Sequence, residues 1–265
     1  MQQVSIIKIG GNIIDDENNL KKFLSGFSKI KSHKILVHGG GKLASDMSER
    51  MGIAPKIVDG RRITDAETLK IVTMVYAGWI NKTIVALLQK EKCDAIGLTG
   101  ADANIIPARK RPATPIDYGF AGDIDTKEIS ADRLSLLIDA GLTPVVAPIT
   151  YSNHDAQLLN TNADTIAASL AIALAKKYDV QLVYCFEKNG VLKNVEDDNS
   201  VINKINKAEY EGYKQNGVIL KGMIPKLDNA FNAIEQGVKE VVIGNANSVV
   251  GLMNNSTNAG TKLIA

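Results

Sequence analysis

Several short segments of this sequence combine glycines with a cationic side chain, directly after a run of apolar residues. The first is KIGGN at residues 8–12, which follows two isoleucines. Because glycine has no Cβ, the amides of Gly10 and Gly11 can approach an anion closely, and Lys8 adds a full positive charge. The pattern indicates a phosphate site. A strand that ends in a turn, with its lysine extended to solvent, has the same pattern.

The second segment is HGGGK at residues 38–42, after the apolar run 35–37. It is not a nucleotide-binding P-loop, because Leu43 stands where that motif has Ser or Thr, and no glycine lies five residues before Gly41. Three consecutive glycines offer a row of amides to a carboxylate or a phosphate. A flexible connection between a strand and a helix is the alternative.

Two arginines form the third candidate. Arg61 and Arg62 precede an apolar pattern that predicts a helix over residues 64–89, with Thr64 and Glu67 spaced as a capping box. An arginine gains nothing from the positive end of a helix dipole. We therefore expect at least one of the two to bind an anion, unless both are solvated in a loop.

The fourth segment, NTNAD at residues 160–164, precedes an alanine-rich helix. Asn162 suits the N-cap position, and the carboxylate of Asp164 suits the first helical turn. Capping gives no role to Asn160.

The composition points to a small partner molecule. The 265 residues include 31 Lys and Arg against 29 Asp and Glu, without a basic or acidic block, which gives no support for a nucleic-acid or membrane-surface partner. Cys93 and Cys185 form no CxxC pair, so neither a disulfide framework nor a zinc site is indicated. The chain has no signal-peptide pattern, and no apolar run reaches the roughly 18 residues of a membrane span. We expect a cytoplasmic protein.

Strand patterns alternate with helical patterns over the whole length. This order predicts an α/β protein with a mostly parallel sheet that helices cover on both faces. In such sheets ligands bind beyond the carboxyl ends of the strands, which is where the glycine-rich segments fall. The segment 93–125 is less regular, and its pattern predicts no chemistry.

The order and spacing of seven segments resemble the amino acid kinase family nearly end to end: KIGGN (8–12), VHGGG (37–41), GRRIT (60–64), GLTG (97–100), GFAGD (119–123), NTNAD (160–164) and GMIPK (222–226). The resemblance implies a three-layer αβα sandwich with a mostly parallel open central sheet. It also implies an N-terminal lobe, residues 1–177, that binds an acylated amino acid and forms a dimer. A C-terminal lobe, residues 178–265, would bind ATP.

The resemblance also implies the site residues. Two lysines contact the transferring phosphoryl group and an aspartate holds them: Lys8, Lys226 and Asp164. The acylated amino acid binds at Gly40, Gly41, Arg62 and Asn160. ATP binds along Gly10, Gly11, Glu187, Gly190, Leu192 and Gly222. We expect no metal ligand from the protein, because no carboxylates cluster in the sequence; Mg²⁺ would be held mainly by the nucleotide phosphates.

The implied reaction is ATP-dependent phosphorylation of the side-chain carboxylate of N-acetyl-L-glutamate, the second step of arginine biosynthesis. That carboxylate is ionised at neutral pH and attacks without a general base, so none of the three histidines is required. The alternatives are N-succinyl-L-glutamate as the acceptor, a sibling kinase acting on glutamate, aspartate, carbamate or UMP, and a nucleotide-sensing module without turnover. The last of these predicts a broken lysine–aspartate set, and this chain has the complete set.

Two departures from the family pattern affect the ATP side. The segment FEKNG at residues 186–190 stands where the family has Thr/Ser-Asp-Val/Ile-x-Gly, and Lys221 replaces the first glycine of a Gly-Gly-Met motif. The chain begins almost at its first strand, without the extra N-terminal helix that resembles the ring-forming device of arginine-inhibited members. We therefore expect an arginine-insensitive homodimer that pairs through the helix 64–89.

Overall fold

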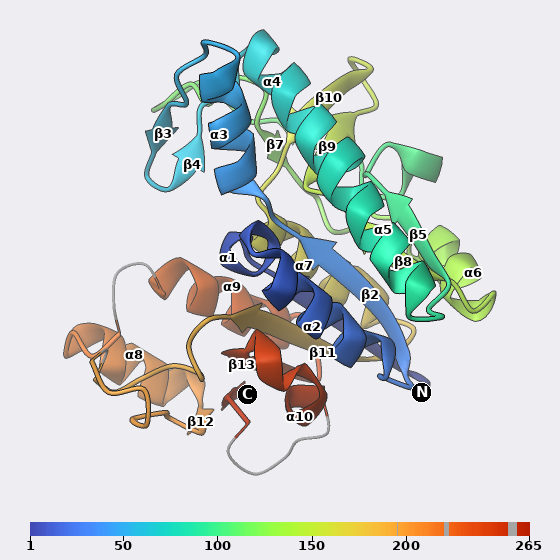
Figure 1. Cartoon of the computed structure of the whole chain (residues 1–265). Helices are drawn as coiled ribbons and strands as arrows, with labels where there is room; N and C mark the ends of the chain where they lie inside the picture. The colour runs from blue at the N-terminus through green and yellow to red at the C-terminus, as the bar shows by residue number, and fades with distance from the viewer. Residues whose placement is uncertain (195, 220–222, 254–258) are drawn as a thin grey trace.

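The computed structural model describes residues 1–194, 196–219, 223–253 and 259–265 (Figure 1). Eight strands form one open sheet, and every neighbouring pair is parallel except the β13–β14 pair. This arrangement confirms the predicted α/β class with a mostly parallel sheet. The strand order is β12 (Lys204–Ile205), β14 (Thr261–Leu263), β13 (Glu240–Asn245), β11 (Asp179–Phe186), β1 (Gln3–Ile9), β2 (His33–His38), β8 (Thr143–Val146) and β5 (Ala95–Leu98).

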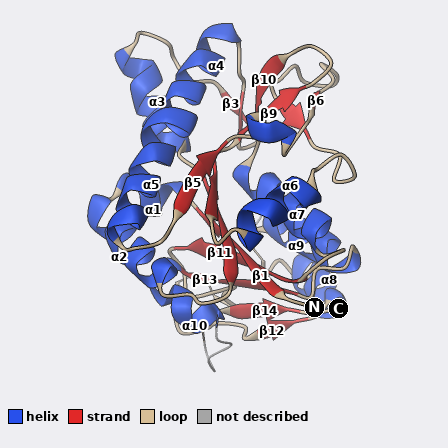
Figure 2. Ribbon diagram, turned by 90° about the vertical axis from the view of Figure 1, so that its right-hand side faces the viewer, coloured by secondary structure: helices blue, strands red, loops and turns tan. Residues whose placement is uncertain are grey.

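Helices cover both faces of the sheet, so the molecule has three layers (Figure 2). Successive side chains of a strand point to opposite faces, and accordingly Ile6 packs with one group of helices and Ile7 with the other. The group on the side of Ile7 is α1 (Gly11–Asp15), α2 (Glu17–Ser28), α3 (Gly41–Arg50), α4 (Ala66–Thr73), η1 (Met74–Ile80), α5 (Asn81–Lys90) and α10 (Val249–Met253). The group on the side of Ile6 is α6 (Ala131–Asp139), α7 (Ala163–Leu174), α8 (Lys207–Gln215) and α9 (Ile224–Glu235).

Three two-stranded sheets lie outside the central one. They are β3 (Ile57–Val58) with β4 (Arg61–Arg62), β6 (Arg109–Lys110) with β7 (Gly122–Asp123), and β9 (Ile149–Ser152) with β10 (Gln157–Asn160). Two short 3₁₀ helices are η2 (Asp102–Asn104) and η3 (Ala246–Ser248).

The predicted helix over residues 64–89 is present as the continuous run α4, η1 and α5, in which η1 is a π-helical segment. The expected capping box is wrong. The N-cap is Asp65, whose side chain accepts a hydrogen bond from the Thr68 amide. Thr64 cannot take that position, because its amide and its carbonyl both pair with the backbone of residues 118–120.

Within the described part of the chain, Ala66–Lys90 is the one helical run that is long and apolar enough to cross a membrane, judged by length and composition alone. Buried residues make up 44% of its most apolar window. A helix that packs into a protein core meets the same two criteria.

One predicted strand proves to be two elements. The apolar pattern predicts a single strand over 143–149, but β8 ends at Val146 and β9 leaves the central sheet to pair with β10. Pro148 lies at the break, and proline has no N–H with which to extend a strand ladder. The resulting hairpin carries Asn160 to the end of β10, and both Pro148 and Asn160 line one cavity.

Candidate active site

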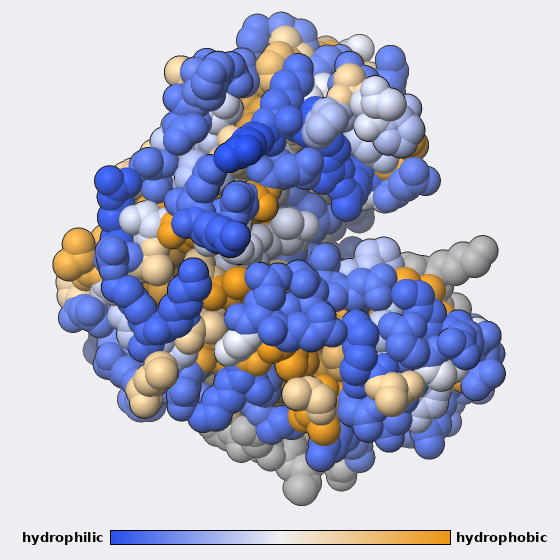
Figure 3. Space-filling model, turned by 180° about the vertical axis from the view of Figure 1, so that it is seen from behind, coloured by the Kyte–Doolittle hydropathy of each residue, from blue (hydrophilic) through white to orange (hydrophobic). Residues whose placement is uncertain are grey.

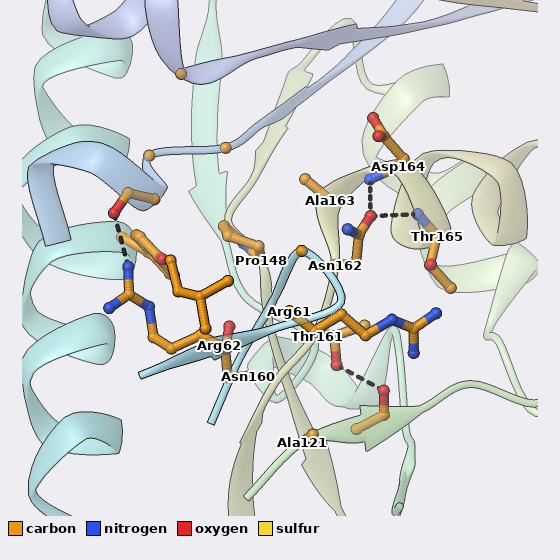
Figure 4. A pocket seen from close by; sticks show the side chains of 18 of the residues that line it. Arg61, Arg62, Ala121, Pro148, Asn160, Thr161, Asn162, Ala163, Asp164 and Thr165 are labelled. Atoms are coloured by element: carbon orange, nitrogen blue, oxygen red, sulfur yellow. Dashed lines mark hydrogen bonds between the residues drawn. The ribbon is translucent and has the colours of Figure 1, made fainter. Parts of the chain in front are cut away.

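The molecule is hollowed on one side (Figure 3), and a cavity of about 380 Å³ lies at the carboxyl ends of β1 and β2 (Figure 4). This is the position where parallel sheets bind their ligands. All four segments singled out in the sequence contribute to its wall, although they lie far apart along the chain. The predicted site residues that line it are Lys8, Gly11, Gly40, Gly41, Arg62, Asn160 and Asp164.

Lys8 and Asp164 form an ion pair at the wall of this cavity. Lys8 lies near the end of β1 and is 9% exposed, and its Nζ is 2.7 Å from a carboxylate oxygen of Asp164. Asp164 is held in the first turn of α7, where the Asn162 side chain accepts hydrogen bonds from the amides of Asp164 and Thr165, which confirms the predicted N-cap. A lysine in so buried a strand requires an opposite charge, and Asp164 supplies it.

Lys226 contacts the other oxygen of the same carboxylate, at 2.8 Å. It belongs to the first turn of α9, which has a proline, Pro225, at its start. Burial raises the pKa of Asp164, but Lys8 and Lys226 together outweigh burial and hold the pKa below its usual value. The carboxylate is therefore ionised, and it draws two ammonium groups to one place.

Three helices begin at the cavity: α1 at Gly11, α3 at Gly41 and α7 at Ala163. The first amides of a helix have no acceptor within the helix and carry the positive end of its dipole. Gly40, the N-cap of α3, has φ of +142°, and a Cβ there would lie 2.2 Å from Cδ1 of Ile80. A glycine at this position lets the backbone form the cavity wall without a side chain in the way.

Arg62 lies on the side of the cavity away from Asp164 (Figure 4). Its Nη2 donates to the Gly41 carbonyl at 2.8 Å and to the Ser45 hydroxyl at 2.7 Å. Its Nη1 is buried and has no hydrogen bond of good geometry within the described structure, although the Tyr76 side chain lies close enough to interact with the guanidinium. A buried donor without an acceptor is costly, so this atom suits an anionic ligand in the cavity.

Asn160 is linked to the β3–β4 hairpin. Its Nδ2 donates to the Thr64 hydroxyl at 2.9 Å, and its amide donates to the Phe120 carbonyl. The backbone of Thr64 is also hydrogen-bonded to the 118–120 segment. These contacts place Asn160 beside the hairpin that carries Arg62.

The residues predicted for ATP divide into two groups. Gly11 lines the cavity, and a Cβ on Gly10 would lie 3.9 Å from the ammonium group of Lys8. The second group does not line this cavity: Glu187, Gly190 and Leu192 follow the end of β11. There the Glu187 carbonyl accepts from Asn245, while Gly190 and Leu192 are buried. Gly222 and the departure at Lys221 lie outside the described residues.

A second cavity, of about 370 Å³, lies beside this segment and is lined by Asn189 and Asn245 among others. Lys188 forms an ion pair with Asp198 there, at 2.7 Å. The FEKNG segment thus lies in a polar loop, and the ion pair of Lys188 links this loop to Asp198 further along the chain.

Sequence reasoning missed several residues of the cavity. Arg111 lines it and forms an ion pair with Asp123, and its guanidinium lies 5.4 Å from the ring centre of Tyr118, another lining residue. Both belong to the irregular segment 93–125, whose position depends on tertiary contacts. Ser45 was also missed, although its spacing of four residues from Gly41 puts it on the same face of α3.

His38 supports the glycine-rich loop that follows β2. The ring is fully buried, its Nδ1 lies 2.8 Å from the Gly39 carbonyl, and its Nε2 lies 3.2 Å from Nδ2 of Asn81. Burial lowers the pKa of His38 to about 4. The ring is therefore neutral at pH 7, with its proton on Nδ1 as the donor to Gly39, and it contributes no charge to the cavity.

A sequence model of the amino acid kinase family matches residues 3–245, the range that holds the two lysines and their shared aspartate. The chain belongs to the amino acid kinase family.

Curated relatives of this amino acid kinase cover all or nearly all of its length. It is 57% identical to an acetylglutamate kinase of Cytophaga hutchinsonii, with 100% of both chains covered. It is 51% identical to an acetylglutamate kinase of Parabacteroides distasonis, over 94% of this chain and 96% of the relative.

Solved structures with the same fold are more distant in sequence. A carbamate kinase from Giardia lamblia bound to AMP-PNP has a TM-score of 0.72 at 15% identity, covering 100% of this chain and 99% of its own. An N-acetylglutamate synthase from Neisseria gonorrhoeae, complexed with coenzyme A and N-acetyl-glutamate, has a TM-score of 0.83 at 20% identity, covering 99% of this chain and 59% of its own. Both confirm the predicted amino acid kinase fold.

The wall of this cavity has two cationic parts. Lys8 and the start of α1 form one, and Arg62 and the start of α3 form the other. Bringing two anionic reactants together is the main difficulty of phosphoryl transfer to a carboxylate, and an array of fixed cations and amides reduces that cost.

Proposed function

We propose that this chain transfers the γ-phosphoryl group of ATP to the side-chain carboxylate of N-acetyl-L-glutamate, as in the second step of arginine biosynthesis. The observation that carries the proposal is the contact of both Lys8 and Lys226 with Asp164. The names of curated relatives at 51–57% identity support the choice of acceptor.

In the proposed mechanism, the acceptor carboxylate attacks without a general base, because it is already ionised at pH 7. Negative charge spreads over the phosphoryl oxygens during transfer, and Lys8 and Lys226 stabilise it together with the amides at Gly10 and Gly11. Asp164 acts on the lysines: its carboxylate offsets their mutual repulsion and holds them in position. No side chain of this set has to act as a general acid or base in the step.

The amino acid end of the acceptor is proposed to bind at Arg62, Asn160 and the amides of Gly40 and Gly41. The unpaired Nη1 of Arg62 supports the assignment of the α-carboxylate to this residue. A guanidinium matches a carboxylate in geometry as well as in charge.

For ATP we propose Gly10, Gly11, Glu187, Gly190, Leu192 and Gly222 as the binding residues. Mg²⁺ would be held mainly by the nucleotide phosphates and would neutralise part of their negative charge. No group of three or more His, Cys, Asp or Glu side chains within the described ranges is arranged to hold a metal ion. Asp164 is not free to bind a metal ion, because it is already paired with two lysines. The described residues therefore fit a Mg²⁺ ion that the nucleotide phosphates hold.

We further propose a two-lobed cytoplasmic enzyme, with residues 1–177 binding the acceptor and residues 178–265 binding ATP. A homodimer through the helix 64–89 is supported by Trp79 and Met74, whose exposed fractions are 72% and 54%. Large apolar side chains with this exposure suit a protein interface.

A panel of acceptors tests the reaction. The enzyme is incubated with ATP, Mg²⁺ and either N-acetyl-L-glutamate, free glutamate, aspartate, carbamate or UMP. Acyl phosphates are trapped as hydroxamates, and ADP release is followed for every acceptor. Highest kcat/KM with N-acetyl-L-glutamate supports the proposal, and highest kcat/KM with free glutamate, carbamate or UMP contradicts it.

A further inference from the structure

The backbone of Asp164 is held by side chains on both of its sides. The Asn162 side chain accepts a hydrogen bond from the Asp164 amide at 2.8 Å (Figure 4). The Tyr184 hydroxyl donates to the Asp164 carbonyl at 3.3 Å. Asn162 is the N-cap of α7 and acts locally, whereas Tyr184 comes from β11, 20 residues further along the chain. The second contact therefore links the start of α7 to the central sheet.

Tyr184 lies directly beside Lys8 in that sheet. The two residues are register partners on the neighbouring parallel strands β11 and β1. Side chains of such partners point to the same face of a sheet, and on this face Tyr184 packs with α7. Two adjacent strands thus reach the same residue of α7: Lys8 contacts the carboxylate of Asp164, and Tyr184 contacts its carbonyl.

The hydroxyl of Tyr184 is a polar group in an otherwise apolar environment. Tyr184 is 1% exposed, and among the described residues its hydroxyl is hydrogen-bonded to Asp164 alone. Burial and the charge of Asp164 raise the pKa of Tyr184 well above its usual value, so the hydroxyl stays protonated and acts as the donor. The helix uses one lone pair of the carbonyl for the amide four residues on, and the second lone pair can accept from the phenol.

The position of Asp164 matters because two ammonium groups depend on it. Lys8 and Lys226 each contact one of its carboxylate oxygens, at 2.7 Å and 2.8 Å. A shift of the first turn of α7 would move the carboxylate and both ammonium groups with it. Displacements of about 1 Å can change a rate by about 100-fold. Tyr184 does not line the cavity, so it can influence the reaction only through the residues that it contacts.

We propose that Tyr184 is a positioning residue of the phosphoryl-transfer site, whose hydroxyl holds Asp164 at a fixed distance from the central sheet. The two lysines that contact Asp164 are positioned through this hydrogen bond. The inference rests on the proposed function, because it requires that these lysines stabilise the transferring phosphoryl group.

Tyr184→Phe removes the hydroxyl and keeps the ring. We expect kcat to fall about fivefold while the KM values for ATP and for the acceptor stay within about twofold of the wild type, because neither reactant touches this residue. Circular dichroism gives the folded fraction, and kcat is expressed per folded enzyme. Tyr184→Met also lacks the hydroxyl and has a side chain that adapts to a core, so it should show the same kinetic pattern.

Tyr178→Phe is the matched control. Tyr178 is also buried, with 7% exposed, and its hydroxyl contacts Asp139 at 3.4 Å, beyond the opposite end of α7. The substitution removes the same atom from a position that does not line the cavity. Its kcat should equal that of the wild type. A fall in kcat as large as that of Tyr184→Phe would overturn the inference, because the effect would then come from core packing in general.

A double-mutant cycle tests whether the hydroxyl acts through Asp164. In an Asp164→Asn background, Tyr184→Phe should change kcat by less than about twofold, because the charge that holds the two lysines is already absent. The full fivefold fall in this background would overturn the inference. A wild-type kcat in the single variant Tyr184→Phe, or a rise in KM without a change in kcat, would overturn it as well.

The acceptor in these assays is the one with the highest kcat/KM in the panel. Free glutamate, carbamate or UMP as that acceptor contradicts the proposed function, yet the comparison of the Tyr184 variants still decides this inference. A wild-type enzyme that phosphorylates no acceptor overturns the proposed function, and this inference with it.

Discussion

Lys8 and Lys226 come from opposite ends of the chain, yet each places its ammonium group against one oxygen of the same carboxylate, at 2.7 Å and 2.8 Å. Two cations so near each other repel, and the ionised Asp164 between them offsets that repulsion. An incoming phosphoryl group adds negative charge beside them. The two ammonium groups are therefore stabilised most when the phosphoryl group, with its added negative charge, lies beside them.

Lys8→Arg is expected to lower kcat by about 100-fold or more with a smaller effect on KM, because the interaction is strongest in the transition state. Arginine keeps the charge, but it is longer than lysine, whose Nζ already lies 2.7 Å from the Asp164 carboxylate, so the charge is displaced. Steady-state kinetics with N-acetyl-L-glutamate and ATP measure this effect. Lys21→Arg, on the exposed side of α2, serves as the control, and an unchanged kcat in Lys8→Arg would remove Lys8 from catalysis.

Arg62→Ala is expected to raise the KM for the acylated amino acid by about tenfold or more while the KM for ATP changes little, because a charge-assisted pair to the α-carboxylate is lost. The two KM values are measured with the other substrate saturating. Arg50→Ala, at the exposed end of α3, should leave both values unchanged. A selective increase in the KM for ATP would assign Arg62 to the nucleotide instead.

The buried His38 predicts a loss of stability in mild acid. Its pKa is about 4 in the folded protein and about 6.5 when unfolded. Between these values the unfolded state binds more protons, so the free energy of unfolding decreases as the pH falls from about 6.5 toward 4.

From pH 7 to pH 5 the contribution of His38 to this decrease should be about 2 kcal/mol, measured by urea denaturation at each pH. His38→Gln should lack this contribution to the pH dependence of the free energy of unfolding. His154→Gln should keep it, because the side chain of His154 is 92% exposed. Equal pH dependence in the wild type and His38→Gln would contradict a neutral buried ring.

The observed N-cap predicts which residue stabilises the start of α4. Asp65→Ala should lower the free energy of unfolding by about 1 kcal/mol, because the Thr68 amide loses its acceptor. Glu67→Ala, which changes the residue of the expected capping box, should cost less than about 0.5 kcal/mol. The reverse order in denaturant unfolding would support the original capping box.

The proposed dimer predicts an effect of a charge on the exposed side of η1. Light scattering of the wild type should give the mass of two 28.5 kDa chains, and Trp79→Asp should shift it toward one, because a buried charge without a partner opposes association. Leu136→Asp on α6 is the control, since Leu136 has a similar exposed fraction, 71% against 72%. A wild-type monomer, or a dimer that tolerates Trp79→Asp, contradicts pairing through this helix.

Much of the fold could be predicted because it depends on local patterns. Apolar runs that end in glycine predicted β1 and β2, and the capping side chain of Asn162 predicted the start of α7. The errors came where backbone pairing with distant segments competed with local preference. Thr64 pairs with residues 118–120 and leaves the cap to Asp65, and Pro148 ends β8 and releases β9 from the sheet.

Some residues of the candidate site could likewise be predicted from local sequence, and others could be found only in the tertiary structure. Residue type and spacing were enough to select Lys8, Arg62 and Asp164, because a lysine in a buried strand or an arginine before a helix requires a local explanation. Arg111 could not be found, since nothing near it in the sequence indicates the cavity. The meeting of Lys8 and Lys226 at Asp164 comes from strand pairing and helix packing between segments more than 50 residues apart, because such contacts form only when the sheet is assembled.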